Sequence, residues 1–268
     1  MKILSVNAGS SSLKFQLYEM PEEKVLISGL MERIGVGNSF YTIKVNGEKI
    51  KKEVELNNHE EAFETLVKEL EENNVVESLD EIEGIGHRVV QGGDYFDKTV
   101  VIDDEVLAKI DELSSLAPLH NPAAVTGIKA AKDVFPNAVQ TAVFDTAFHQ
   151  TMPKENFLYA LPISWYTDLK VRRYGAHGTS HKFVSQRMNE ILKRDDTKII
   201  TCHIGNGASV SAVLNGKCVN TSMGLTPNAG LIMGTRCGDI DASIIPYVME
   251  KTNTVSYTHL TLPTILRV

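Results

Sequence analysis

The chain has 268 residues, of which 27 are Lys or Arg and 34 are Asp or Glu, so its formal net charge is −7. This length is enough for one large domain or two ordinary ones. The acidic balance, without any block of like charges, argues against a nucleic-acid-binding or anionic-membrane-binding surface.

No apolar run is long enough to span a bilayer, and Lys2 leads into a strand instead of a signal peptide. Three widely spaced cysteines indicate reduced thiols. We expect a cytoplasmic α/β protein.

Hydrophobic periodicity predicts the elements in chain order. Strand-like alternation near the amino terminus gives way to helical spacing after residue 57, and later strands are short and apolar. Asn46-Gly47 is a hairpin signal, and Pro122 suits the first turn of a helix. The expected strands are 3–6, 24–31, 40–45, 49–56, 82–90, 138–144 and 198–203. The expected helices are 58–73, 104–113, 121–135, 179–193 and 240–251.

The stretch NAGSSSLKFQLY, residues 7–18, follows the first apolar strand. A strand that breaks at small residues and serines and then resumes forms a loop with little side chain. Such a loop can hold a phosphate group through backbone N–H groups and short hydroxyls. A plain hairpin turn is the alternative, and this stretch alone does not separate the two.

A similar design recurs in HIGNGASVSAVLNGKCV, residues 203–219. An apolar strand, a loop of small residues and a returning strand appear again nearly two hundred residues later. This spacing indicates two homologous domains, each presenting one phosphate loop. We expect the first domain over 1–195, the beginning of a second, truncated domain over 196–254, and a non-native tail over 255–268. We therefore expect the chain as it stands to be inactive.

Four further stretches contain residues suited to catalysis, although neither common nucleotide-binding glycine motif is present. GHRVVQGG places Arg88 near the end of a buried strand, and FDTAFH places Asp145 at a strand's carboxyl end, where open α/β sheets bind ligands. RRYGAHGTSH surrounds His177 with glycines, and GLTPNAGLIMGTRCGDID places Arg236 in a glycine-rich loop. Each has a structural alternative: an ion pair for Arg88, a turn cap for Asp145. His120 is interpreted as an exposed residue in a connector.

Taken together, these motifs resemble the acetate kinase family in order and spacing from residue 1 to about 252. The resemblance implies an α/β fold of the actin and hexokinase type, with ribonuclease H-like duplicated domains, the first complete and the second truncated. It also implies a cytoplasmic enzyme, homodimeric at full length, that transfers a phosphoryl group reversibly from ATP to acetate with Mg²⁺. The products are acetyl phosphate and ADP.

The resemblance also assigns roles position by position. The catalytic positions are Asp145, which matches the residue described as an acid/base in this family, and His177 and Arg236, which match its transition-state stabilisers. The substrate positions are Arg88 and three that match a pocket for the acetate methyl group, namely Val90, Leu119 and Pro227. The nucleotide positions are Lys14 and a phosphate loop formed by His203, Ile204, Gly205, Asn206 and Gly207. The magnesium position is Asn7.

Residue chemistry modifies one of these roles and leaves two alternatives open. A short carboxylic acid is already ionised at pH 7, so Asp145 has no proton to remove and is expected to orient an arginine or to hold Mg²⁺ through water. Ala176 stands where the family commonly has a bulky aromatic, which leaves a propionate or butyrate kinase open. A non-catalytic, actin-like nucleotide-binding protein is the other alternative. The family continues beyond this chain with its adenosine-binding loops and a second magnesium carboxylate.

Overall fold

The computed structural model describes residues 1–252, and the chain divides into two compact units, Met1–Ala147 and Phe148–Val268. This division comes earlier than the domain boundary expected after residue 195. The reason is that residues between 148 and 195 pack on the second sheet: α6 (Gly178–Leu192) lies against β9 (Lys198–Ile204), and α4 (Lys154–Phe157) lies against β11 (Lys217–Thr221). The non-native tail expected over 255–268 lies outside the described residues.

The first unit is built on an eight-stranded mixed sheet with the order β5-β4-β3-β2-β1-β6-β8-β7. The central strand β1 runs antiparallel to β2 and parallel to β6, and β6 runs parallel to β8. The carboxyl ends of β1, β6 and β8 therefore lie at one edge of the sheet. The strands are β1 (Lys2–Gly9), β2 (Ser12–Glu19), β3 (Lys24–Glu32), β4 (Phe40–Val45), β5 (Glu48–Glu53), β6 (Ile82–Val89), β7 (Val100–Val101) and β8 (Val139–Phe144).

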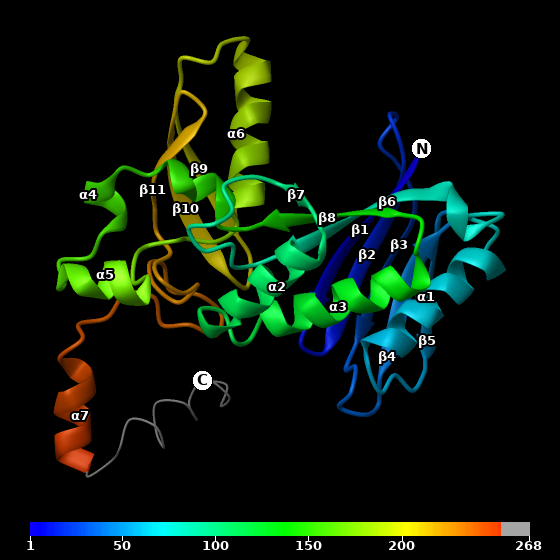
Figure 1. Ribbon diagram of the computed structural model, residues 1–268, viewed down its shortest axis with the longest axis horizontal. Helices are drawn as coiled ribbons and strands as arrows, with labels where there is room; N and C mark the ends of the chain where they lie inside the picture. The colour runs from blue at the N-terminus through cyan, green and yellow to red at the C-terminus, as the bar shows by residue number, and fades with distance from the viewer. Residues whose placement is uncertain (253–268) are drawn as a thin grey trace. The chain divides into compact units, whose positions relative to one another are not determined.

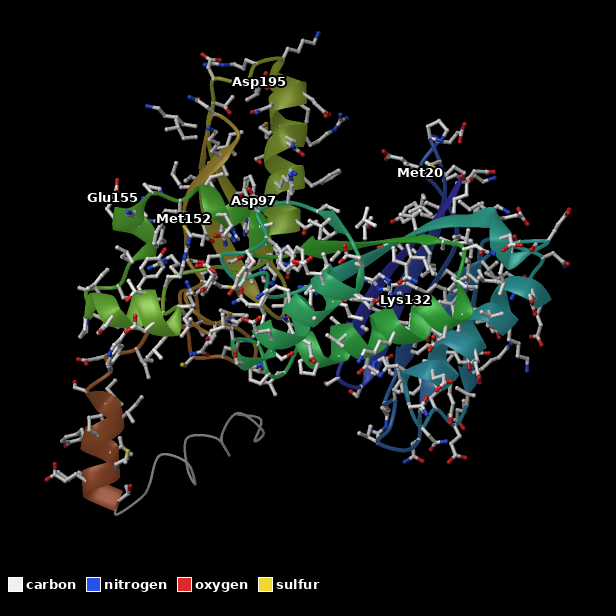
Figure 2. All side chains as sticks on the ribbon, in the orientation of Figure 1. Met20, Asp97, Lys132, Met152, Glu155 and Asp195 are labelled. Atoms are coloured by element: carbon white, nitrogen blue, oxygen red, sulfur yellow. The ribbon has the colours of Figure 1, made fainter. Side chains whose placement is uncertain are left out.

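Helices α1 (His59–Glu72) and α3 (Asn121–Val134) lie side by side across one face of this sheet, with α2 (Asp104–Glu112) next to α3 (Figure 1). Asn58 caps α1 by accepting a hydrogen bond from the backbone N–H of Glu61, which satisfies a helix-terminal donor. Lys132 on α3, labelled in Figure 2, binds the Asp104 carboxylate of α2 at 3.2 Å. The apolar faces of these helices and the sheet form the core, including Leu4, Leu13, Phe15, Phe63 and Leu66.

The second unit contains a three-stranded antiparallel sheet with the order β11-β10-β9, in which β10 spans Ala208–Leu214. Helix α6 lies along β9 (Figure 1). Like β1-β2-β3, these strands are consecutive and antiparallel, which is the recurrence expected from the sequence. The remaining helices are α5 (Ile163–Leu169), α7 (Ile244–Thr252) and the 3₁₀ turns Leu79–Glu81, Leu113–Ser115 and Ala147–Thr151. No helix within residues 1–252 is both long and apolar enough to cross a membrane.

Candidate active site

The β1–β2 hairpin ends in a tighter turn than the sequence suggested. Strand pairing continues to Gly9 and Ser12, so residues 7–9 belong to β1 and only Ser10 and Ser11 form the turn. Asn7 and Lys14 are direct cross-strand partners. Nε2 of His59 lies 2.7 Å from the Gly9 carbonyl oxygen, which can only accept, so His59 donates this hydrogen bond. The hairpin tip is therefore fixed to the start of α1.

A cavity of about 230 Å³ lies beside this hairpin, within the first unit. Its lining combines amide, ammonium, guanidinium and imidazole groups with small apolar side chains. The lining residues are Asn7, Ala8, Gly9, Ser12, Lys14, Leu30, Arg88, Val90, His120 and Ala124. Four of the residues predicted as binding positions, namely Asn7, Lys14, Arg88 and Val90, are therefore brought together here.

His120 also lines this cavity, so the interpretation of His120 as an exposed connector residue is wrong. It is half-buried and stands at the amino end of α3. Helix α3 comes close to β1 because Gly127 faces Ala8: a Cβ at Gly127 would lie 2.7 Å from the Ala8 Cβ. This close approach follows from tertiary packing of a single glycine, which periodicity alone does not reveal.

Arg88 and Asp145 form a forked ion pair at the carboxyl ends of β6 and β8. Nε of Arg88 lies 3.1 Å from each carboxylate oxygen, and Nη2 lies 2.6 Å from Oδ2. Asp145 is 2% exposed, whereas the Arg88 side chain is 40% exposed. Burial by itself lowers the pKa of Arg88, but the Asp145 carboxylate outweighs burial and the net pKa is raised. The pair fixes the guanidinium plane and leaves part of it accessible, which suits binding of a carboxylate or phosphoryl group.

The segment that follows β6 is fixed by a buried amide. Asn121 accepts a hydrogen bond from the Gln91 backbone N–H at 3.1 Å and donates to the carbonyls of Gln91 and Ile110. This network holds Val90 at the cavity. Leu119, the other predicted residue of the methyl pocket in the first unit, is 77% exposed and is not among the lining residues. Its assignment stays a prediction.

In the second unit, the loop 205–207 joins β9 to β10 where the sequence placed a phosphate loop. The Gly205 N–H bonds to the Gly207 carbonyl at 3.0 Å, and the Gly234 N–H bonds to the Asn206 carbonyl at 3.1 Å. A Cβ at Gly207 would lie 3.2 Å from Nη1 of Arg236 and 3.6 Å from Nε2 of His177. Glycine therefore leaves the space between these two cationic or basic side chains open.

Arg236 is oriented by its own loop. Its Nη1 donates to the carbonyl of Pro227 at 3.0 Å, so the backbone of a residue predicted for the methyl pocket holds a residue predicted for catalysis. The backbone N–H of Met233 donates to the Arg236 carbonyl and closes the turn. Of the phosphate-loop positions, Ile204, Gly205 and Asn206 are exposed.

His177 precedes α6 with φ of +63°, a left-handed conformation that is uncommon for residues other than glycine. Its ring stacks on that of His203, with 4.0 Å between ring centroids. Nδ1 of His177 lies 2.8 Å from Oγ of Ser209, and Nδ1 of His203 lies 2.9 Å from Oγ of Ser180. Sequence motifs identified both histidines, but the hydroxyl groups that orient them were not predicted.

At the cavity, the side-chain amide of Asn7 and the hydroxyl group of Ser12 offer neutral oxygen ligands for a metal ion. Within residues 1–252, no cluster of three or more His, Cys, Asp or Glu side chains could hold a metal ion. Mg²⁺ is commonly bound by few protein ligands together with substrate phosphates. Asn7 therefore fits a metal ion that arrives with a nucleotide better than a metal ion held by the protein alone.

Each of the two units has its own chemistry. The first holds a fixed guanidinium in a small cavity with apolar walls, which suits a short carboxylate. The second holds an arginine and a histidine over a glycine of a phosphate-type loop, which suits a phosphoryl group. Arg88 and Asp145 belong to the first unit, whereas His177 and Arg236 belong to the second.

Comparison with known proteins agrees with this chemistry. Residues 2–262 match the family described as the Acetokinase family. Acetate kinases of Macrococcus caseolyticus and Bacillus mycoides are 56% and 58% identical over 253 residues, and these matches cover 94% of this chain and 64% of each relative. The chain therefore spans just under two thirds of the length of these curated relatives.

Solved structures give the same result for the fold. An acetate kinase from Porphyromonas gingivalis is 45% identical, with a TM-score of 0.90, over 96% of this chain and 65% of that one. A propionate kinase from Francisella tularensis is 44% identical, with a TM-score of 0.92, over 98% of this chain and 67% of that one.

Proposed function

The chain belongs to the acetokinase family, and on this premise we propose that the protein transfers the γ-phosphoryl group of ATP reversibly to acetate. A carboxylate oxygen of acetate forms a bond to the γ-phosphorus, and the bond between that phosphorus and the bridging oxygen of ADP breaks. The products are acetyl phosphate and ADP. No proton is transferred from acetate, because its carboxyl group is already ionised at neutral pH.

The roles of the residues follow from their chemistry. Phosphoryl transfer depends mainly on positioning and on neutralising charge around an in-line transition state. Arg88 would bind the acetate carboxylate, and Asp145 would hold the Arg88 guanidinium in place. Arg236 and His177 would bind equatorial oxygens of the transferring group over Gly207. Lys14 and the loop 203–207 would contact the nucleotide phosphates.

The proposed cofactor is Mg²⁺, with Asn7 as a ligand, and the metal ion would neutralise charge on the nucleotide phosphates. A homodimer and a cytoplasmic location are further proposals, and both rest on the family resemblance. Leu119 and Pro227 would contribute to the site of the acetate methyl group.

The observation that carries the proposal is the fixed guanidinium of Arg88 in a cavity of about 230 Å³ that also has apolar walls. A cavity of this size suits a short carboxylate. To test it, the chain is assayed alone and as an extended chain, in which residues 1–252 are joined to the part of the Macrococcus caseolyticus acetate kinase beyond the matched segment. Acetyl phosphate, trapped as its hydroxamate, is expected from the extended chain with ATP, Mg²⁺ and acetate. ATP binding without any acyl phosphate would instead favour the non-catalytic, actin-like protein.

Propionate or butyrate as the preferred acceptor is the second candidate, favoured by Ala176, which is buried beside His177. In the extended chain, Ala176→Phe should lower the propionate-to-acetate ratio of kcat/KM by about tenfold, since one methylene is worth about 1–3 kcal/mol in an apolar site. An unchanged ratio would mean that Ala176 does not border the acyl pocket.

A further inference from the structure

Hydrogen bonds join His177 to the interior of the second unit through three side chains. Nδ1 of His177 lies 2.8 Å from Oγ of Ser209, and the same oxygen lies 2.8 Å from Nε2 of His181. Nδ1 of His181 lies 2.7 Å from Oγ1 of Thr201, and Oγ1 of Thr201 lies 3.4 Å from the backbone carbonyl oxygen of Ser211. Ser209, His181 and Thr201 are all buried. We refer to these three side chains as the hydroxyl–histidine chain.

The backbone carbonyl at the inner end gives the chain a direction. A carbonyl oxygen only accepts, so the Thr201 hydroxyl donates to Ser211 and its oxygen accepts from Nδ1–H of His181. Nε2 of a neutral His181 then has no proton and accepts the single proton of the Ser209 hydroxyl. The Ser209 oxygen is left to accept from Nδ1–H of His177.

This direction requires that His181 is neutral, and its surroundings support that state. His181 is 1% exposed, so a charge there would be almost completely desolvated. Its ring lies 5.9 Å, centroid to centroid, from that of His149, a second buried histidine. Burial is the largest cause that lowers the pKa of His149, to about 3. This part of the protein interior therefore disfavours imidazolium.

A hydroxyl group, imidazole rings and a guanidinium group surround His177. Ser209 bonds to it from β10, His181 of α6 bonds to the other side of Ser209, and His203 stacks on it from β9. Arg236 lies beside Gly207 on the side where Nε2 of His177 lies. His149 is also coupled to His177 electrostatically, but its lowered pKa keeps it neutral near pH 7. An anionic phosphoryl group over Gly207 would offset the positive charge of Arg236 and favour protonation of the second ring nitrogen of His177.

We propose that Ser209, His181 and Thr201 are positioning residues that keep a proton on Nδ1 of His177, so that Nε2 is the nitrogen that gains or loses a proton. Nε2 can then donate a hydrogen bond to a phosphoryl oxygen only after it has taken a proton from solvent, when His177 becomes an imidazolium. This inference rests on the proposed function for the identity of the anion. The placement of the proton is a property of the free protein.

The direct test is nitrogen-15 NMR of the 268-residue chain with labelled histidines, because ring nitrogens with and without a proton have well-separated shifts. At a pH where His177 is neutral, we expect its proton on Nδ1 and none on Nε2. A proton on Nε2, averaging between the two tautomers, or a His177 that never becomes neutral would each overturn the proposal.

Variants test the hydroxyl–histidine chain itself. Ser209→Ala and Thr201→Val should release His177 from the Nδ1–H tautomer, whereas Thr201→Ser, which keeps the hydroxyl, should retain it. Ser185→Ala is the matched control, because Ser185 is a buried hydroxyl on α6 that donates to the Lys182 carbonyl. If Ser209→Ala fails to fold, the comparison of Thr201→Val with Thr201→Ser remains. An unchanged His177 tautomer in a folded Ser209→Ala or Thr201→Val variant would overturn the proposal.

Kinetics of the extended chain give a second readout. In the wild type, kcat should fall as pH rises and the His177 imidazolium loses its proton. In Ser209→Ala this alkaline limb should be shallower or shifted to higher pH, because a His177 with its proton on Nε2 can donate to a phosphoryl oxygen while neutral, and KM for acetate should stay nearly unchanged. An unchanged pH profile of kcat would count against the proposal. A wild-type extended chain without kinase activity but with an Nδ1–H His177 would count against the proposed function alone.

Discussion

The guanidinium of Arg88 contacts the carboxylate of Asp145 through both Nε and Nη2, with a shortest distance of 2.6 Å. This geometry identifies the carboxylate as the group that orients the arginine, one of the two roles that residue chemistry favoured over that of a base. Asp145 lies at the end of β8 and Arg88 lies near the end of the adjacent parallel strand β6. The pair therefore follows from strand order, with no further element needed to position it.

The Arg88–Asp145 pair should make Arg88→Met strongly destabilising, by up to about 3–5 kcal/mol, because the buried Asp145 carboxylate would lose its counter-charge. Urea unfolding followed by far-UV circular dichroism measures the change. The double variant Arg88→Met/Asp145→Leu should recover most of the loss, since no buried charge remains. If Arg88→Met costs less than about 1 kcal/mol, water already compensates Asp145 and the pair does not organise this edge of the sheet.

Arg236→Ala in the extended chain should lower kcat by about 10²–10³ and change KM for acetate much less. Arg236 lies beside Gly207 in the second unit, where it would act on transition-state charge. Steady-state rates with acetate and ATP check this prediction. Arg187→Ala is a suitable control, because Arg187 is an exposed arginine of α6 paired with Glu190. A normal kcat would remove Arg236 from the proposed mechanism.

Much of the fold was predictable because local patterns agree with tertiary packing. The helix expected over 58–73 is observed as His59–Glu72 with Asn58 as its cap, and the strand expected over 40–45 matches β4. The short helices α4 and α5 were not predicted, because four and seven residues are too few to establish a helical period. The compact-unit division at residue 147 was not predicted either, since it depends on contacts between α6 and β9.

The site was predictable where residue type determines the chemistry, and less so where burial does. Motifs identified Arg88 and Asp145, but not that they pair at two nitrogen atoms. His120 was misinterpreted, because its place at the cavity results from tertiary packing of α3 near β1, which local sequence does not show. The hydroxyl groups of Ser209 and Thr201 were missed because serine and threonine in a strand give no sequence signal until the facing histidines are placed. Whether the residues of the two units converge on one substrate stays a prediction.

A buried triad in the first unit should make stability depend on pH. Glu69 is 1% exposed and accepts hydrogen bonds from Lys52, at 2.6 Å, and from Tyr41. Burial by itself raises the pKa of Glu69, but these hydrogen bonds outweigh it and lower the pKa. The stabilisation is therefore fully present above the unfolded-state pKa of about 4.3 and is lost as pH falls through the lower folded-state pKa.

Lys52→Met tests this triad. The variant should be less stable than the wild type at pH 7, and the difference in free energy of unfolding should shrink as pH falls below about 4.3. Urea unfolding at a series of pH values measures it. Lys49→Met on the same strand is the control, since the Glu69 carboxylate bonds to Lys52, Tyr41 and Asn73. A constant difference down to acid pH would show that the charge of Glu69 is not involved.

His87 should contribute a second pH dependence. Burial lowers its pKa to about 4, despite the hydrogen bond at 2.9 Å between its Nε2 and Gln140. Between about pH 6.5 and 4, the unfolded chain binds a proton that the folded chain does not, so the free energy of unfolding falls with decreasing pH by up to about 1.4 kcal/mol per unit. His87→Leu should remove the contribution of this one proton to the pH dependence of the free energy of unfolding. The same slope in both proteins would contradict a neutral His87 in the fold.

The outer faces of α6 and β9 should promote self-association of the 268-residue chain. Phe183 and Ile191 on α6 and Ile200 on β9 are each more than 60% exposed, and β9 lies at an edge of the three-stranded sheet within the described residues. Exposed apolar side chains beside an unpaired strand edge favour association.

Sedimentation velocity should show a concentration-dependent shift to larger species, and Ile200→Lys combined with Ile191→Lys should reverse it. Val36→Lys, which replaces one exposed apolar side chain of the first unit, should leave the shift unchanged. A wild-type chain that stays monomeric at all concentrations would show that these faces do not drive association.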